Sequence, residues 1–233
     1  MPSQLGHSFM LTFLVIASCW PETGLCQEHF LSEVAIKEVE NLPRNKGVPD
    51  SGHLTVTGLT LWKHTIEDAR EKLGLADVIE PGQHYDPYVC YRPAREDDGT
   101  VLTLSFNNRG STHFLTRIQI IAASETFKAR NSCTKSLLVS RDLSTQRGIH
   151  IGVAPEQVKK ILAVRAKETE EYLVATSEYY EEMGKGDQVT CNDTFWMTIA
   201  RFASAGLTWL EILADGELIR QGHCTQEELA QKR

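Results

Sequence analysis

Apolar residues recur with helical spacing in two short segments of the chain. In the first segment, Ile66, Ala69 and Leu73 fall on one face of a helix, and charged side chains fall on the other. Thr65 stands where a side-chain oxygen can accept hydrogen bonds from the free amides of a first helical turn. Gly74 follows the last apolar position and fits a C-cap. This pattern predicts a short amphipathic helix that begins after Thr65.

The same signals predict a second short helix further along the chain. Val158, Ile161 and Leu162 form its apolar face, with charged residues opposite. Pro155 suits its first turn, because proline has no amide hydrogen that would be left unpaired there.

Six other segments have the residue types and the alternation of β-strands. Polar turn signals separate them. The acidic stretch 96–99, for example, ends in Asp98-Gly99 and predicts a hairpin connection. The predicted strands are residues 85–91, 101–106, 114–121, 172–180, 195–202 and 207–213.

The order of helix and strands occurs twice because the chain repeats itself. Residues 57–73 recur as residues 147–162 at an offset of about 90 residues, and residues 115–120 match residues 207–212 at a similar offset. The predicted fold class is therefore α+β. It consists of two tandem repeats, each a short helical segment packed on an antiparallel β-meander.

The N-terminal residues predict export. Residues 9–17 are nearly all apolar, which fits the core of a signal peptide and is too short to span a bilayer. Two processing sites remain open: cleavage after Cys26, which removes a signal peptide of residues 1–26, or lipidation of Cys19, which removes residues 1–18. The predicted divisions after the leader are an N-terminal segment and linker (27–52), a first α+β repeat (53–132), a second α+β repeat (133–226) and a polar tail (227–233).

Composition and charge narrow the class of partner. The chain has 233 residues, a net charge of −7 and 41% hydrophobic residues, the balance of one or two packed domains. Its 31 acidic against 24 basic residues argue against a sequence-independent nucleic-acid binder, which would need a basic patch. We expect no nucleic-acid partner, and membrane contact only through a lipid anchor at Cys19.

The cysteines predict disulfides. Cleavage after residue 26 leaves four of the six cysteines, whereas lipidation of Cys19 leaves five. No Cys-x-x-Cys pair occurs, so disulfides are favoured over a metal site in an oxidising compartment. Four cysteines allow three pairings, and the sequence does not choose among them. We favour one bridge in each repeat, Cys90–Cys133 and Cys191–Cys224.

One phrase of the sequence carries a resemblance. Residues 148–158 read Gly-Ile-His-Ile-Gly-Val-Ala-Pro-Glu-Gln-Val, and a weaker copy surrounds Gly58. With the order of elements, this phrase resembles small bacterial envelope modules, which include outer-membrane assembly lipoproteins of the SmpA/OmlA type and the tandem-repeat β-lactamase inhibitor protein. The resemblance implies helical segments on an antiparallel sheet and a non-enzymatic binding role. The chain lacks the expected Gly after Leu162, and the residues that inhibit β-lactamase cannot be placed on it.

No motif for catalysis, a metal or a cofactor is found. The eight histidines form no His-Glu-x-x-His motif, and the short glycine turn at 184–186 is followed by no predicted helix that could hold a phosphate. We therefore expect no metal site and no cofactor. The alternative is a secreted enzyme with a dispersed active site around His84 and His113, near Asp86.

Strand alternation predicts an aromatic binding surface. If Leu210 lies in the core, Trp209 faces outward, and if Met197 lies in the core, Trp196 faces outward. The opposite assignment, with both tryptophans in the core, stays open. Trp, Tyr and Arg are the residue types enriched in protein-binding hot spots. The candidate partner-binding residues are Trp196, Trp209, Arg117 and Tyr88.

The sequence thus predicts an exported, non-enzymatic module that binds a protein or a cell-envelope component through its sheet faces. Its expected location is extracytoplasmic: periplasmic, secreted or lipid-anchored to the envelope. Two alternatives remain, the dispersed enzyme around His84 and His113 and a lipid-anchored envelope scaffold attached through Cys19.

Overall fold

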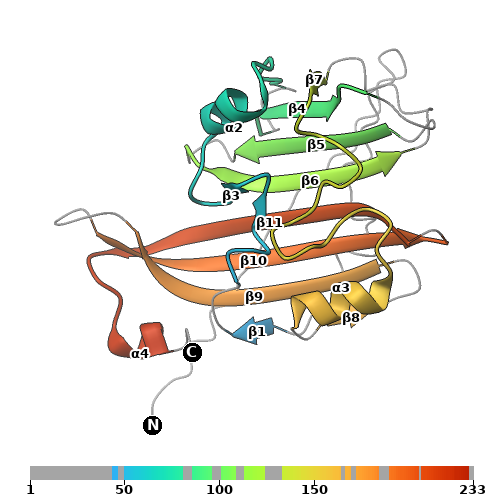
Figure 1. Ribbon diagram of the computed structural model, residues 1–233. Coiled ribbons are helices and arrows are strands. Elements are labelled where there is room, and N and C mark those ends of the chain that lie inside the picture. Colours follow the sequence, from blue (N-terminus) through green and yellow to red (C-terminus); the bar gives the residue numbers. More distant parts are fainter. Residues whose placement is uncertain are drawn as a thin grey trace, which may run out of the picture.

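The computed structural model describes residues 44–46, 50–80, 86–95, 101–108, 113–123, 133–163, 166–168, 172–183, 189–204 and 206–230. These residues form one large sheet, a small hairpin and three short helices (Figure 1). The strands are β1 (Arg44–Lys46), β2 (Thr55–Val56), β3 (Leu59–Thr60), β4 (Tyr88–Pro93), β5 (Val101–Asn108), β6 (Leu115–Ala123), β7 (Thr134–Ser136), β8 (Ala166–Glu168), β9 (Tyr172–Met183), β10 (Thr190–Ala203) and β11 (Gly206–Gln221). The helices are α2 (Ile66–Leu73), α3 (Pro155–Leu162) and α4 (Gln226–Ala230).

The large sheet has nine strands and is mixed. Its order is β1-β9-β10-β11-β6-β5-β4-β7, and β8 pairs with β9 beside β1. The pairs β1·β9 and β4·β7 are parallel, and the other pairs are antiparallel. The smaller sheet is the hairpin β2–β3, whose turn at Thr57 and Gly58 has positive φ at both residues. That geometry matches the right-handed twist of paired strands.

The predicted fold class, an α+β fold of two tandem repeats, was wrong. Instead of two separate helix-on-meander repeats, the described chain is mostly β and builds one continuous sheet, because β11 pairs with β6. The join is antiparallel and sets Leu210 beside Ile120 and Ile212 beside Ile118. Separate meanders would leave two strand edges with unpaired backbone groups, whereas pairing them satisfies those groups and makes one core.

The two predicted helices are present, and they are short. α2 and α3 each have eight residues. Thr65 caps α2 as predicted: its side chain accepts from the amide of Asp68, and the Asp68 carboxylate accepts from the Thr65 amide at 2.7 Å. This reciprocal capping box satisfies two amides that a helix start leaves free. α3 begins at Pro155, and Ala163 ends it in the left-handed conformation with φ 52°.

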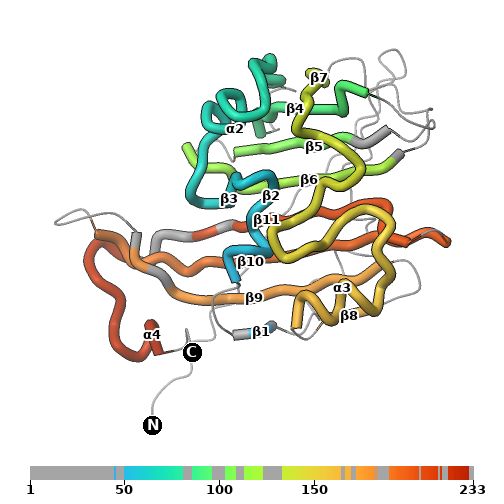
Figure 2. The backbone as a smooth tube through the Cα atoms, viewed as in Figure 1, coloured from blue at the N-terminus to red at the C-terminus, as the bar shows by residue number. Residues whose placement is uncertain are grey.

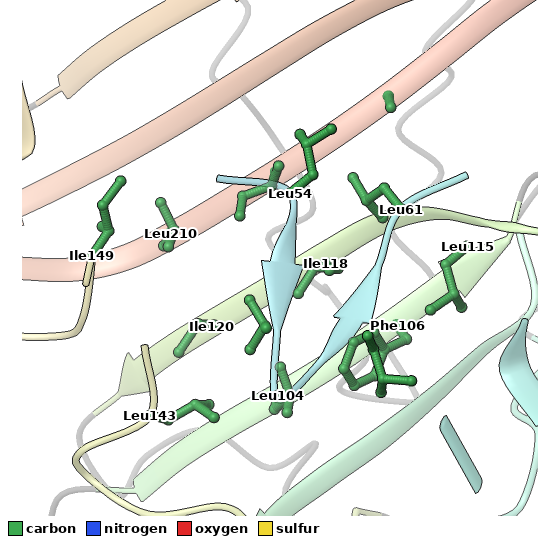
Figure 3. Packing of buried hydrophobic residues seen from close by; sticks show 14 of the residues in the cluster. Leu54, Leu61, Leu104, Phe106, Leu115, Ile118, Ile120, Leu143, Ile149 and Leu210 are labelled. Carbon is green, nitrogen blue, oxygen red and sulfur yellow. The ribbon is translucent and has the colours of Figure 1, made fainter. Parts of the chain in front are cut away.

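The main hydrophobic core covers one side of the large sheet, which we call the first face. Leu104, Phe106, Ile118, Ile120 and Leu210 project from this face, each at most 1% exposed. Figure 3 shows the hairpin segment lying across these strands, with Leu54 and Leu61 packed over them. Burial of a large aliphatic side chain stabilises the fold by about 1.5–3 kcal/mol, so this cluster dominates the stability.

The chain between β7 and α3 crosses the same face from one side of the sheet to the other (Figure 2). It is held by the β-bridge between Val56 and Thr145. Two backbone hydrogen bonds also tie it to Leu207: the Gly152 amide donates to the Leu207 carbonyl at 2.7 Å, and the Leu207 amide donates to the Val153 carbonyl at 2.9 Å. Gly206 allows this approach, because a Cβ there would stand 2.3 Å from the carbonyl oxygen of Gly152. Together, this segment, the hairpin and the helices α2 and α3 cover the first face.

The opposite side of the sheet, the second face, has its own smaller apolar cluster. Met197 and Ile199 are buried there, at 6% and 4% exposure. They belong to β10, and their neighbours in the cluster come from β9, β10 and β11. These half-buried neighbours are Tyr172, Val174, Phe195 and Leu213.

Both predicted disulfide pairs are confirmed. Cys90 of β4 bonds to Cys133, just before the edge strand β7, with the Cα atoms 4.7 Å apart. Cys191 of β10 bonds to Cys224, just before α4, with the Cα atoms 4.9 Å apart. Disulfides of this kind form in oxidising compartments outside the cytoplasm.

Candidate functional site

An aromatic and cationic row lies across one end of the second face. Arg201 of β10 stands between Tyr172 of β9 and Trp209 of β11, because it is the register partner of both residues. The Arg201 guanidinium carbon lies 5.6 Å from the centre of the Tyr172 ring, which is the geometry of a cation–π contact. Arg201 is exposed, and both rings are half-buried. We call these three residues the aromatic row.

The aromatic row continues into the apolar cluster of the second face. Along β10, Ile199, Met197 and Phe195 follow Arg201 at every second position, so all four side chains project from the same face. The face therefore combines large apolar side chains with an exposed cation at one end. This arrangement has the residue types of a protein-binding hot spot, in which anchors fill pockets of the partner.

An ion pair lies in the middle of the second face. Arg117 Nε of β6 lies 3.2 Å from Glu211 Oε1 of β11, and the Glu211 side chain is 11% exposed. Next to it, Ser105 Oγ donates to Gln119 Oε1 at 3.1 Å, and Gln119 is the register partner of both Ser105 and Glu211. Alternation places Glu211 on the same face as Trp209, but Glu211 was not among the predicted site residues, because its pairing with Arg117 depends on the register of two strands that are distant in the chain.

Two of the four predicted binding residues lie on the central strands of this face. Trp209 faces outward as predicted and belongs to the aromatic row, and Arg117 pairs with Glu211. Tyr88 is half-buried on β4, and the strands β5 and β6 separate it from β11. The structure therefore brings Trp209 and Arg117 onto adjacent strands and leaves Tyr88 apart from them.

The predicted orientation of Trp196 is wrong. Trp196 is 1% exposed and belongs to the main core on the first face, whereas Met197 lies on the second face. The physical reason is that β10 carries apolar side chains on both faces. Alternation fixes which residues share a face, and it does not say which face is covered.

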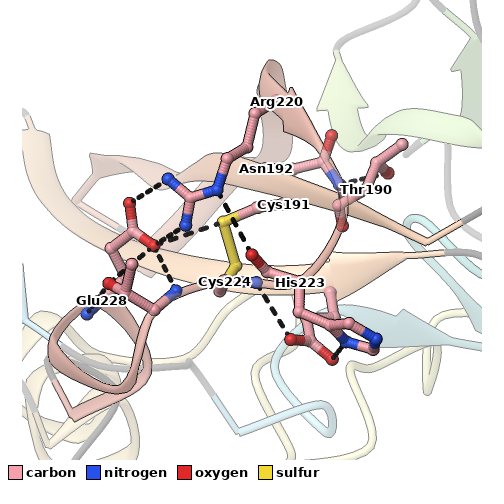
Figure 4. Close-up of a disulfide and its surroundings, with 9 residues drawn as sticks. Thr190, Cys191, Asn192, Arg220, His223, Cys224 and Glu228 are labelled. Carbon is pink, nitrogen blue, oxygen red and sulfur yellow. Dashed lines mark hydrogen bonds and ion pairs between the residues drawn. A yellow bond between two sulfur atoms is a disulfide. The ribbon is translucent and has the colours of Figure 1, made fainter.

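A second polar cluster ties α4 to the sheet near the disulfide Cys191–Cys224 (Figure 4). Glu228 of α4 pairs with Arg220 of β11, and Glu228 Oε2 accepts from the Thr225 amide at 2.6 Å. The Arg220 guanidinium first, and the Thr225 amide second, lower the pKa of Glu228 to about 2. Glu182 of β9 accepts from the Cys224 amide at 3.0 Å and lies 3.2 Å from the His223 ring. We call this group the α4 clasp.

The α4 clasp is structural. Cys191, Cys224 and Glu228 lie close enough together to suggest a metal site, but both sulfur atoms are used in the disulfide and offer no thiolate. Each carboxylate of the clasp accepts hydrogen bonds from the clasp itself. Residues 226–230, which the sequence assigned partly to a polar tail, are held to the sheet in this way.

The two histidines of the predicted alternative site cannot be compared in space. His84 lies outside the described residues, and His113 is an exposed residue before β6. Cys19 and the leader also lie outside the described residues. In the part of the chain that is described, no helix is long and apolar enough to cross a membrane.

Comparison of the chain with family models, with curated proteins and with solved structures finds no match.

Proposed function

We propose that the protein is an exported, non-enzymatic binding module that holds a protein or cell-envelope partner against the second face of its sheet. The observation that carries this proposal is the aromatic row: Tyr172, Arg201 and Trp209 side by side on three adjacent strands, with Arg201 exposed. Aromatic residues and arginine are enriched in interface hot spots because they combine large contact area with few rotatable bonds or with several donors.

Three further features support a binder. The row is continuous with apolar side chains of β9, β10 and β11, which offers a partner a surface to desolvate. The Arg117–Glu211 pair lies on the same face, and the partly exposed Arg117 side chain adds a second cation with which an acidic partner group could pair. The resemblance of residues 148–158 to bacterial envelope modules favours a partner in the cell envelope.

The test is capture of partners from an envelope extract of the native host by the immobilised mature protein, with quantitative mass spectrometry. Trp209→Ala and Arg201→Ala should each lower the recovery of the partner. For a hot-spot residue that contributes about 2 kcal/mol, the affinity should fall about 30-fold.

Lys160→Ala is the matched control, because Lys160 is exposed on α3, which packs against the first face. A partner that Lys160→Ala retains and the two row variants lose supports the proposal. Equal recovery of every captured protein by the wild type and by both row variants contradicts it.

The proposed location is outside the cytoplasm, and the finer location depends on processing of the leader. Cleavage after Cys26 gives a periplasmic or secreted protein, whereas lipidation of Cys19 gives an envelope lipoprotein. Intact mass of the protein from its native host, with and without reduction, separates the two. A chain that starts at Gln27 supports the soluble form, and an acyl addition on Cys19 supports the anchored form and the scaffold role.

A further inference from the structure

Three polar side chains of the first face are buried, and each has one hydrogen-bonding atom without a partner in the described structure. His53 is 7% exposed, and Trp196 and Thr198 are each 1% exposed. The atoms without a partner are His53 Nδ1, Trp196 Nε1 and Thr198 Oγ1. A buried polar atom that lacks a hydrogen bond loses its interaction with bulk water and gains nothing in return, so such atoms are rare in folded proteins.

The three residues are neighbours in space. Thr198 follows Trp196 by two positions in β10, so both side chains project from the first face. The rings of Trp196 and His53 have their centres 6.5 Å apart and are tilted by 37°. Trp196 is therefore the common neighbour of Thr198, on the same strand, and of His53, in the turn just before β2.

The residues around this group are small or apolar. The register partners of Trp196 are Ser177 and Ala214, and those of Thr198 are Ala175 and Ile212. The neighbouring strands carry short side chains here, at Ala175, Ser177 and Ala214. Little more than the backbone of these strands therefore lies next to the polar groups. No cationic side chain is among these register partners.

The chemistry of the three atoms defines what can satisfy them. An indole N–H donates and never accepts, and a threonine hydroxyl does both. Burial lowers the pKa of His53, which favours the neutral imidazole with one donor and one acceptor nitrogen. Nδ1 accepts in one tautomer of the imidazole and donates in the other, so a species that satisfies all three groups must accept from the indole and be able both to donate and to accept. A metal ion does neither, since it cannot accept a hydrogen bond.

We infer that a buried water molecule bridges His53, Trp196 and Thr198 and ties the start of the β2–β3 hairpin to strand β10. The water accepts from Trp196 Nε1–H and donates to His53 Nδ1, and the Thr198 hydroxyl is its third partner. About three hydrogen bonds are usual for a buried water. This inference concerns the covered side of the sheet and is independent of the proposed binding function.

The first test uses the sign of a stability change. Thr198→Val keeps the shape of the side chain and removes the hydroxyl. If the water is present, the variant loses one hydrogen bond, and the melting temperature should fall by about 2–4 °C. If the hydroxyl is unpaired, its removal should raise the melting temperature. Thr103→Val, at a half-buried position of β5, measures the effect of the same exchange at a less buried threonine. The inference is overturned if Thr198→Val raises the melting temperature, or lowers it by no more than Thr103→Val does.

The second test observes the water directly by NMR on protein with ¹⁵N-labelled indole groups. The Trp196 indole proton should show a cross-relaxation peak with water in the wild type, and Thr198→Val should weaken or remove it. Trp209, which lies half-buried on the second face, is the control, because its signal should not respond to Thr198→Val. Trp196→Phe assigns the signal. Absence of the cross-relaxation peak in the wild type overturns the inference, whatever the unfolding result.

Discussion

Trp196 and Trp209 lie on adjacent strands, and the sheet gives them opposite surroundings. Trp196 is 1% exposed among the apolar side chains of the first face, whereas Trp209 is half-buried on the second face beside Arg201. Two residues of one chemical type therefore provide an internal comparison between a core position and a surface position.

Alanine substitution should separate the two tryptophans. Trp196→Ala leaves a cavity in the main core and should lower the free energy of unfolding by about 3–5 kcal/mol. Trp209→Ala removes fewer packed contacts and should cost clearly less, while it weakens partner capture. Urea unfolding of both variants, followed by circular dichroism, gives the comparison. A loss of stability in Trp209→Ala as large as that in Trp196→Ala would place Trp209 in the core and remove it from the binding face.

Glu228 should make the stability of the protein depend on acid. Its folded-state pKa of about 2 lies below the ordinary glutamate pKa, because Arg220 and the Thr225 amide stabilise the carboxylate. A lowered pKa contributes stability above the unfolded pKa of about 4.3, and this contribution is lost as the pH falls through that value toward 2. Glu228→Gln keeps the shape and cannot ionise.

The free energy of unfolding of the wild type should therefore exceed that of Glu228→Gln near pH 6, and the difference should shrink toward pH 2. Denaturant unfolding of both proteins at several pH values measures it. High salt should reduce the difference at pH 6, since the pair is close to solvent. A difference that does not change with pH would show that the charge of Glu228 plays no part in holding α4.

At the scale of elements, the two eight-residue helices end differently. α2 ends at Gly74, whereas α3 ends at Ala163, which has φ 52°. A residue with a Cβ pays a steric cost in this left-handed conformation, and glycine does not. The sequence already marks the difference, since glycine is missing after Leu162.

Ala163→Gly should therefore stabilise the protein, by about 0.5–1 kcal/mol after the added entropy of the unfolded chain is counted. Thermal unfolding followed by circular dichroism is sufficient to detect this. Ala203→Gly is the control, because Ala203 is exposed at the end of β10 and its φ is not positive. Glycine there should lower stability, and equal effects at the two sites would refute the role of the left-handed cap.

Local elements of this fold could be predicted from the sequence, and their assembly could not. Thr65 and Pro155 mark helix starts through the chemistry of the first turn, and the apolar periodicity located the six longer strands. The pairing of β6 with β11 joins segments that are distant in the chain, and no local signal encodes it. It converts two expected meanders into one sheet.

The site shows the same division between local and non-local information. Trp209 was predicted to face outward, and it does, although β11 shifts register next to it and both Leu207 and Leu210 lie in the main core. Trp196 was placed on the wrong face, because β10 is apolar on both sides and alternation alone cannot orient such a strand. Tyr172 and Arg201 were not singled out, because the aromatic row exists only through the register of β9, β10 and β11.

At the scale of the whole molecule, the two disulfides close different parts of the structure. Cys90–Cys133 fixes the segment that leads into the edge strand β7, and Cys191–Cys224 fixes the segment that leads into α4. They join residues 43 and 33 positions apart, so the chain-entropy model gives each a similar stabilisation of about 4 kcal/mol through the unfolded state. The folded states without them should nevertheless differ.

Removing Cys191–Cys224 should act mainly on α4, because α4 buries no residue and depends on the clasp around Glu228. In Cys191→Ala/Cys224→Ala the α4 segment can fray in the folded state. Fraying gives the folded state some of the conformational entropy that the unfolded chain gains when the disulfide is removed, so the fall in the global free energy of unfolding is smaller. Amide hydrogen exchange in 226–230 should accelerate strongly. Cys90→Ala/Cys133→Ala should instead lower the global free energy of unfolding by about 2–5 kcal/mol, with little change of exchange in α4. If both double variants lose equal global stability and α4 exchange is unchanged, the disulfide at Cys191 holds the whole sheet and not the helix alone.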